Sequence, residues 1–153
     1  MTKFTLIILT SLFAFGCSSP NDYSNMADVD SELIAKGNLS GIDTEAISNQ
    51  YFSITNQTEW ENFISQIDVT NDVSSGFAEQ DIDFSEYVVI AVIDQVRNTS
   101  GYSIDLEIST NYAKIFIGSN LSSPSPDGVV ATVISQPYHI VKIAKTNLPI
   151  DIL

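Results

Sequence analysis

The chain has 153 residues with 19 acidic side chains against six basic ones, which gives a formal net charge of −13 at pH 7. Phosphate groups repel such a protein, so the composition argues against a nucleic-acid partner. The single cysteine excludes an intrachain disulfide. The length suits one domain of about 100 residues, large enough to bury a core without disulfides, together with an N-terminal extension.

The first 17 residues are typical of a bacterial lipoprotein signal. Lys3 precedes an apolar run from Phe4 to Phe15, which has secretory length and is too short to span a membrane. The run ends in Ala14-Phe15-Gly16-Cys17, which resembles a lipobox, although Phe15 departs from its commonest form. We therefore predict that residues 1–16 are removed and that Cys17 carries a lipid. The alternative is an ordinary secretory signal that contains a chance cysteine.

A lipid on Cys17 predicts a protein held on a membrane of the cell envelope, because each buried methylene adds about 0.8 kcal/mol of membrane affinity. Ser18 resembles the signal for transfer to the outer membrane in some bacteria. Residues 17–48 are predicted to form a flexible tether, since the stretch up to Asp30 is polar and without periodicity. Residues 31–41 are ambiguous, because their aliphatic side chains could pack as a short strand or turn where the chain reaches the domain of residues 49–153.

A strand and a helix are predicted at the start of this domain. Tyr51–Ile54 has strand composition, and Asn56 with Glu59 three residues later forms a capping box. The apolar residues that follow recur at helical spacing and predict an amphipathic helix over 57–67; they are Trp60, Phe63, Ile64 and Ile67. We expect Trp60 to anchor this helix on a sheet.

Five strand-like runs follow the helix. Tyr87–Ile93 is apolar on both faces, which is typical of a central strand, whereas Tyr102–Ser109 alternates between apolar and polar residues. The other predicted strands are Ala113–Ile117, Val129–Ile134 and Tyr138–Lys145. Short connections favour antiparallel pairing. The fold class is therefore α+β: one amphipathic helix packed on a mainly antiparallel sheet or small sandwich of about five to seven strands.

Two connections between these strands are candidate partner-binding loops. In the first, Gly101 can adopt the positive φ of a tight turn; in the second, two prolines stiffen an exposed stretch. A plain hairpin turn and a plain connector are the alternative interpretations. The candidate residues are Asn98, Ser100, Gly101, Tyr102, Pro124, Pro126 and Asp127.

Catalytic and metal-binding signatures do not emerge from the sequence. His139 is the single histidine and lacks a second imidazole or a thiolate with which to hold zinc. Alternation places it on the face of Val141 and Ile143, and we expect a structural or surface histidine. The chain contains no nucleophile elbow, phosphate-binding loop or zinc-protease motif. We therefore expect no cofactor, no metal and no enzymatic activity.

The C-terminal part resembles a known family. The resemblance rests on the apolar strand Val88–Ile93, the turn Ser100-Gly101-Tyr102, the strand-like run Val129–Ile134 and the end Gln136–Ile143. These features are similar to the C-terminal domain of PrcB-type protease-complex subunits, which are small bacterial envelope lipoproteins. The match spans Val88 to Lys145 and departs at Ser100, where a second glycine is common.

The resemblance implies a membrane-tethered binding or assembly module with an envelope protein as partner, in support of a protease complex. It implies no active site, because the shared motifs are structural. The alternatives are a protease inhibitor, which would insert the stiff 120–128 loop, and a small envelope hydrolase, which would need His139 in a cleft beside a serine and an aspartate.

Overall fold

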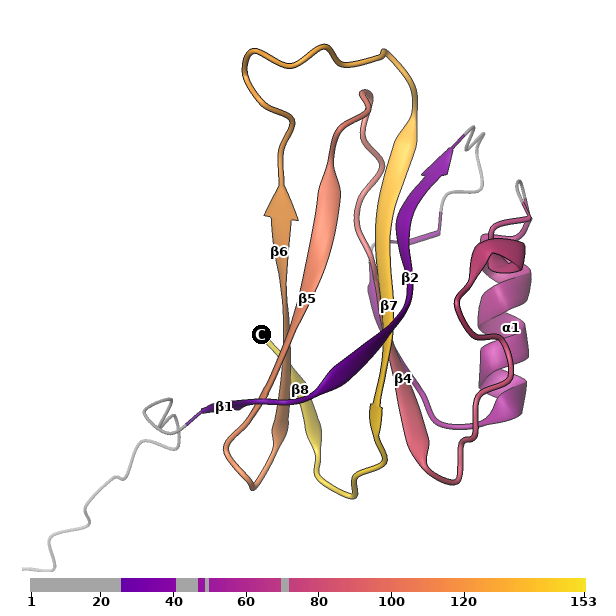
Figure 1. Cartoon of the computed structure of the whole chain (residues 1–153), viewed down its shortest axis with the longest axis vertical. Helices are drawn as coiled ribbons and strands as arrows, with labels where there is room; N and C mark the ends of the chain where they lie inside the picture. The colour runs from indigo at the N-terminus through magenta and orange to yellow at the C-terminus, as the bar shows by residue number, and fades with distance from the viewer. Residues whose placement is uncertain (1–25, 41–46, 49, 70–71) are drawn as a thin grey trace, which may run out of the picture.

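The computed structural model describes residues 26–40, 47–48, 50–69 and 72–153. Two four-stranded sheets and one helix lie in three layers (Figure 1). We call the sheet that the helix covers the middle sheet and the other one the outer sheet. The described part of the chain therefore forms a β-sandwich with a helix on one outside face.

The middle sheet has the strand order β2-β7-β4-β3, and every pairing in it is antiparallel. Its strands are β2 (Ser31–Ser40), β3 (Gln50–Ile54), β4 (Tyr87–Ile93) and β7 (Ser135–Ala144). The expectation that 87–93 forms a central strand is confirmed, since β4 is paired on both edges and buried on both faces.

The outer sheet has the order β1-β5-β6-β8. Its strands are β1 (Ala27–Asp28), β5 (Ser103–Thr110), β6 (Ile115–Ser122) and β8 (Ile150–Ile152). The β6–β8 pair is parallel, whereas β1–β5 and β5–β6 are antiparallel. β1 and β2 are nearly continuous, so one stretch of chain crosses from the outer to the middle sheet, a common way to close a sandwich corner.

Helix α1 (Gln57–Ile67) forms as its sequence predicts. The side chain of Asn56 accepts a hydrogen bond from the Glu59 amide at 3.0 Å, and Glu59 accepts one from the Thr55 amide at 2.8 Å. The pair is a variant of the capping box, in which Glu59 bonds the amide one residue before the N-cap rather than that of Asn56. Two short segments after the helix complete this layer, a 3₁₀ turn at Ser74–Gly76 and an irregular stretch over residues 77–86 that reaches β4.

Two apolar cores separate the three layers. Between the helix and the middle sheet, Trp60 and Phe63 pack onto strand residues such as Val89 and Ile140. Between the two sheets, the core consists of Val88, Ile90, Ile108, Ile115, Ile117, Val141 and Ile143. Alternation along β4 and β7 supplies both cores from the same strands, because successive side chains point to opposite faces.

Lys142 is a buried lysine at the edge of the helix-side core, near the start of β4. Lys142 is 8% exposed and lies 2.5 Å from Glu79, 3.4 Å from Glu32 and 4.3 Å from the centre of the Tyr87 ring. The hydrogen bond to Glu79 raises the pKa of Lys142 above its ordinary value. The lysine therefore remains charged, and its charge ties β7 to β2 and to the segment after α1.

The structure corrects three expectations from the sequence. The part of the predicted tether from Ala27 onward is folded: β1 and β2 pair with β5 and β7, and Ile34, Ala35 and Leu39 are buried. The described residues contain eight strands rather than five to seven, since β1, β2 and β8 add to the predicted set. These strands are short or polar on one face, which weakens the periodic signal.

The third correction concerns Val129–Ile134, which is not a strand. β6 continues to Ser122 and β7 begins at Ser135, so the residues between them form an arch over one end of the sandwich (Figure 1). β-branched composition favours an extended backbone, but a strand also requires a neighbouring strand to pair with.

Within the described residues, none of the helices has the length and apolarity that a membrane-spanning segment requires.

Candidate binding surface at the apex of the sandwich

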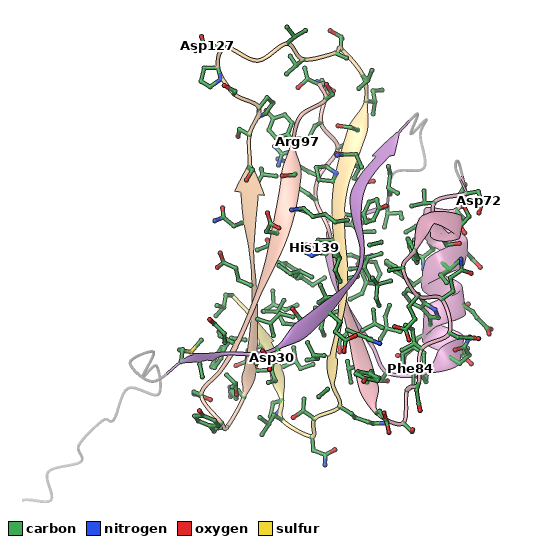
Figure 2. The ribbon with its side chains drawn as sticks, in the orientation of Figure 1. Asp30, Asp72, Phe84, Arg97, Asp127 and His139 are labelled. Atoms are coloured by element: carbon green, nitrogen blue, oxygen red, sulfur yellow. The ribbon has the colours of Figure 1, made fainter. Side chains whose placement is uncertain are left out.

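The two loops predicted to bind a partner meet at one end of the sandwich. The β4–β5 connection (residues 94–102) and the β6–β7 connection (residues 123–134) lie together at the upper end in Figure 1. We call these two connections the apex. All seven candidate loop residues belong to it, and Asp127 lies at the top of the arch with Arg97 below it (Figure 2).

Gly101 is the point at which the two connections touch. Its φ is +91°, a backbone conformation that side chains disfavour. A Cβ atom placed on Gly101 would lie 3.1 Å from Pro124 Cβ and 3.2 Å from Pro124 Cγ. The glycine is therefore required both by the turn and by the close approach of the proline loop.

A Gly101→Ala variant is expected to lose about 1 to 2 kcal/mol of stability, because alanine is strained at positive φ and its methyl group would press on Pro124. Chemical denaturation of both proteins measures the loss. Gly76→Ala is the matched control, since a Cβ there meets nothing within 4 Å. Equal stability of the two variants would contradict the packing described here.

Ser100 fastens the arch to the first connection. Its amide donates to the Ala131 carbonyl at 3.0 Å, and its hydroxyl accepts from the Ala131 amide at 2.9 Å. Further along, Ser135 and Arg97 exchange two backbone hydrogen bonds, and the Ser135 hydroxyl donates to the Thr99 carbonyl at 3.0 Å. The arch is thus held at its middle and at its end, while most of its side chains remain exposed.

An ion pair supports the apex from below. The Nε and Nη2 atoms of Arg97 both donate to one carboxylate oxygen of Asp94, at 3.0 and 2.5 Å, and the two side chains are only 17% and 12% exposed. The guanidinium also lies 4.9 Å from the centre of the Tyr102 ring, a distance suited to a cation–π contact. The Tyr102 carbonyl accepts from Asn38 of β2. These contacts join the β4–β5 connection to the middle sheet.

The most exposed apolar side chains of the apex were not identified as binding residues from the sequence. Val129, Val130, Val133 and Ile134 are 104%, 40%, 43% and 47% exposed, and Val96 of the β4–β5 connection is 38% exposed. Their composition resembled a core strand, which concealed their exposure. A signal was nevertheless available, because the stretch directly follows a Ser/Pro loop that makes a long connection.

His139 lies in the middle of the sandwich and is 9% exposed (Figure 2). Its Nδ1 accepts a hydrogen bond from the Leu106 amide at 3.0 Å and lies 3.7 Å from the Asp105 carboxylate. Asp105 is itself paired with Lys36 at 2.5 Å. In a catalytic triad the carboxylate accepts a hydrogen bond from Nδ1–H, but here Nδ1 is itself the acceptor. The contacts fit a structural histidine that links the two sheets.

Burial lowers the pKa of His139 below its ordinary value of 6.5, and the charge of Lys36 adds to this, while Asp105 opposes it. The fold therefore favours the neutral imidazole. The unfolded chain binds a proton first as the pH falls through 6.5, so the stability that His139 contributes is present above that pH and is lost below it.

A His139→Gln variant is expected to be less stable than the parent at pH 8 but to lose less stability between pH 7 and pH 5, because it lacks the single histidine of the chain. Urea denaturation across this range gives both slopes. Parallel slopes for parent and variant would show that the imidazole is not held neutral.

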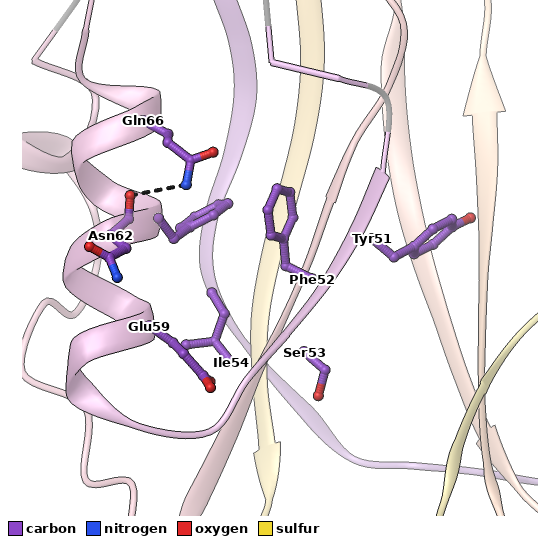
Figure 3. A pocket seen from close by; sticks show the side chains of 8 residues that line it. Tyr51, Phe52, Ser53, Ile54, Glu59, Asn62 and Gln66 are labelled. Carbon is purple, nitrogen blue, oxygen red and sulfur yellow. Dashed lines mark hydrogen bonds between the residues drawn. The ribbon is translucent and has the colours of Figure 1, made fainter.

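An open hollow of about 340 Å³ lies between α1 and β3 (Figure 3). Phe52 and Phe63 are among its apolar lining residues, and Glu59, Asn62 and Gln66 line it from the helix. The Gln66 side chain donates to the Asn62 carbonyl, and Glu59 caps the helix. Because the side chains of Glu59 and Gln66 already form hydrogen bonds with the helix or its N-terminus, we assign no ligand to the hollow.

Among the described residues, no three histidine, cysteine or acidic side chains cluster in a way that could hold a metal ion.

Cys17 and the signal of residues 1–16 lie outside the described residues.

A comparison with protein families matches residues 88–144 to the family described as PrcB C-terminal. No curated protein and no solved structure gives a significant match. The matched segment runs from β4 to the end of β7, so it contains both connections of the apex and His139. Residues 88–144 are therefore similar to the PrcB C-terminal domain.

Proposed function

We propose that this protein is a non-enzymatic binding or assembly module, tethered to the bacterial cell envelope by a lipid on Cys17, whose apex contacts an envelope protein. The observation that carries the proposal is the meeting of both candidate loops in one surface with exposed aliphatic side chains. Loops held by a rigid scaffold are common sites of recognition. The family described as PrcB C-terminal supports a protease complex as the setting.

The path of the chain supports presentation of the apex away from the membrane. Ala27 of β1 pairs with Thr110, beside the β5–β6 turn, whereas the apex lies at the other end of β5. The nine residues from Ser18 to Met26 span at most about 30 Å when fully extended. The eight residues of β5 add about 27 Å between the chain's point of attachment and the apex. A lipid on Cys17 would thus place the β5–β6 turn nearer the membrane.

A Cys17→Ser variant is expected to move from the membrane fraction to the soluble fraction, because it has no thiol to accept a lipid. Cell fractionation with immunodetection measures the distribution, and metabolic labelling with an alkyne fatty acid measures the lipid. Retention of the variant in the membrane fraction, or equal labelling of both proteins, would contradict the anchor. Ser18→Ala is the matched control, and we expect it to remain lipidated.

The contacts of His139 favour a binding module over a hydrolase. Its Nδ1 is occupied by a backbone amide, and its neighbouring carboxylate is occupied by Lys36. A general base requires the opposite polarity at that nitrogen and a nucleophile on the other. The inhibitor alternative uses the same apex, and it differs in outcome: a bound protease would lose activity rather than gain or keep it.

A further inference from the structure

We propose that residues 129–134 bind an extended segment of a partner protein by pairing with it as an additional β-strand, and that this segment carries positive charge. The proposal rests on the proposed function and specifies how the apex would bind. The stretch has the composition of a strand but is not one in the structure. A strand from a partner would supply the neighbour that this composition favours and that the fold does not provide.

The side chains of residues 129–134 are largely aliphatic and exposed, as in an interface whose partner is absent. Four aliphatic residues within six positions are at least 40% exposed: Val129, Val130, Val133 and Ile134. β-branched side chains pack well against a neighbouring strand. Contiguous apolar exposure of this kind marks interaction sites in soluble proteins.

The backbone is fixed at one point of the segment. Ala131 exchanges two hydrogen bonds with Ser100, and its carbonyl also accepts from the Val133 amide at 3.0 Å. A backbone that is already anchored loses less entropy on pairing with a second strand. The anchor also orients the two halves of the segment on either side of Ala131.

Charge and residue composition indicate which kind of chain would pair with residues 129–134. A second copy of this chain would bring together two proteins of net charge −13, which disfavours self-association. The chain's own polar stretch from Ser18 to Met26 lacks alternating apolar residues, so it does not match an aliphatic strand. Asp127 is exposed next to the segment, and the charge of Arg97 is neutralised by Asp94. An extended segment with basic residues is therefore the complementary partner.

The test uses the full chain and a synthetic octapeptide in which valine alternates with lysine or threonine. Hydrogen exchange is measured with the peptide, with a version in which glutamate replaces lysine, and with a version N-methylated at alternate amides. Strand pairing predicts slower exchange with the first peptide at the amides of 129–134 other than those of Ala131 and Val133, which are already hydrogen-bonded. The N-methylated peptide should give no such slowing, because N-methylation removes the hydrogen bonds of one edge. We expect about tenfold weaker binding of the glutamate version.

A pair of substitutions at one exposed position serves as the internal control. Thr132→Pro removes an amide hydrogen and is expected to weaken peptide binding about tenfold, whereas Thr132→Ala keeps the amide and is expected to bind like the parent. Chemical denaturation checks that both variants fold. Equal binding by the two variants, or equal binding of the N-methylated peptide, would overturn strand pairing.

Two further outcomes separate this proposal from the proposed function. A dimer of the full chain that Thr132→Pro dissociates would make a second copy the occupant and overturn the choice of a basic partner. If an envelope protein crosslinks to the apex in cells but the octapeptide leaves exchange at 129–134 unchanged, strand pairing fails while the binding module stands. Crosslinks that map away from the apex would reject the proposed function itself.

Discussion

Replacement of Trp60 by alanine is expected to lower the free energy of unfolding by about 3 to 5 kcal/mol, which is a large part of the stability of a domain this size. Trp60 is 0% exposed and packs against Phe63 and Phe77 at ring-centre distances of 5.8 and 5.9 Å, stacked on the first and tilted to the second. Its removal leaves a cavity at the centre of the helix-side core. Urea denaturation followed by circular dichroism measures the loss.

Trp60→Phe separates the ring from its polar atom. The indole nitrogen donates to the Gln80 carbonyl at 2.9 Å, and this bond ties the helix to the segment that leads into β4. Phenylalanine keeps much of the apolar area but leaves that carbonyl without its donor, so we expect a loss of about 1 to 3 kcal/mol. A loss below 1 kcal/mol for Trp60→Ala would contradict the central place given to this residue.

The second large effect is expected at the ion pair below the apex. Arg97→Met should destabilise the protein by about 2 to 4 kcal/mol, because it leaves the carboxylate of Asp94 in a position that is 9% exposed without its cation. The variant also loses the contact with the Tyr102 ring. We expect faster hydrogen exchange in both connections of the apex, whereas the helix should exchange at its original rate.

A double variant tests whether the cost comes from the unpaired charge. Asp94→Asn combined with Arg97→Met removes both charges, so it should recover part of the stability lost by Arg97→Met alone. Arg97→Lys keeps the charge but loses the two-atom contact with Asp94, and we expect it to fall between the parent and Arg97→Met. Additive losses from the two single substitutions would show that the side chains are not coupled.

Local patterns were sufficient to predict the helix and the central strands. The capping box of Asn56 and Glu59 and the stripe that begins at Trp60 depend on residues within two helical turns, so they are readable from the chain alone. β4 was equally clear, because a run of apolar β-branched residues is buried on both faces.

The errors arose where pairing partners lie far apart in the sequence. β2 pairs with β7 about 100 residues away, and its exposed Glu32 and Lys36 made it resemble a polar extension. The opposite error occurred at Val129–Ile134, whose composition predicts a strand that does not form. The middle sheet has no open position for it next to β7, because β7 already pairs with β2 and β4. Propensity specifies a preference for extended backbone and not the neighbour that a strand requires.

The same limit applied to the candidate site. The turn at Gly101 and the stiffness of the 120–128 loop were predictable from glycine and proline, and the positive φ is confirmed. That Gly101 lies against Pro124 and that Ser100 holds Ala131 could not be predicted, because these contacts depend on the stacking of the sheets. The exposure of the aliphatic arch follows from that geometry.

Photo-crosslinking in living bacterial cells tests the central claim, that the apex is the surface through which the anchored protein meets its partner. A photoreactive residue is placed at position 129 or 133 of the full lipidated chain, and at position 112, an exposed site in the β5–β6 turn at the other end of β5. We predict one crosslinked envelope protein, identified by mass spectrometry, from the two apex positions and a reduced yield after Gly101→Ala. The same product from position 112 alone would contradict the account.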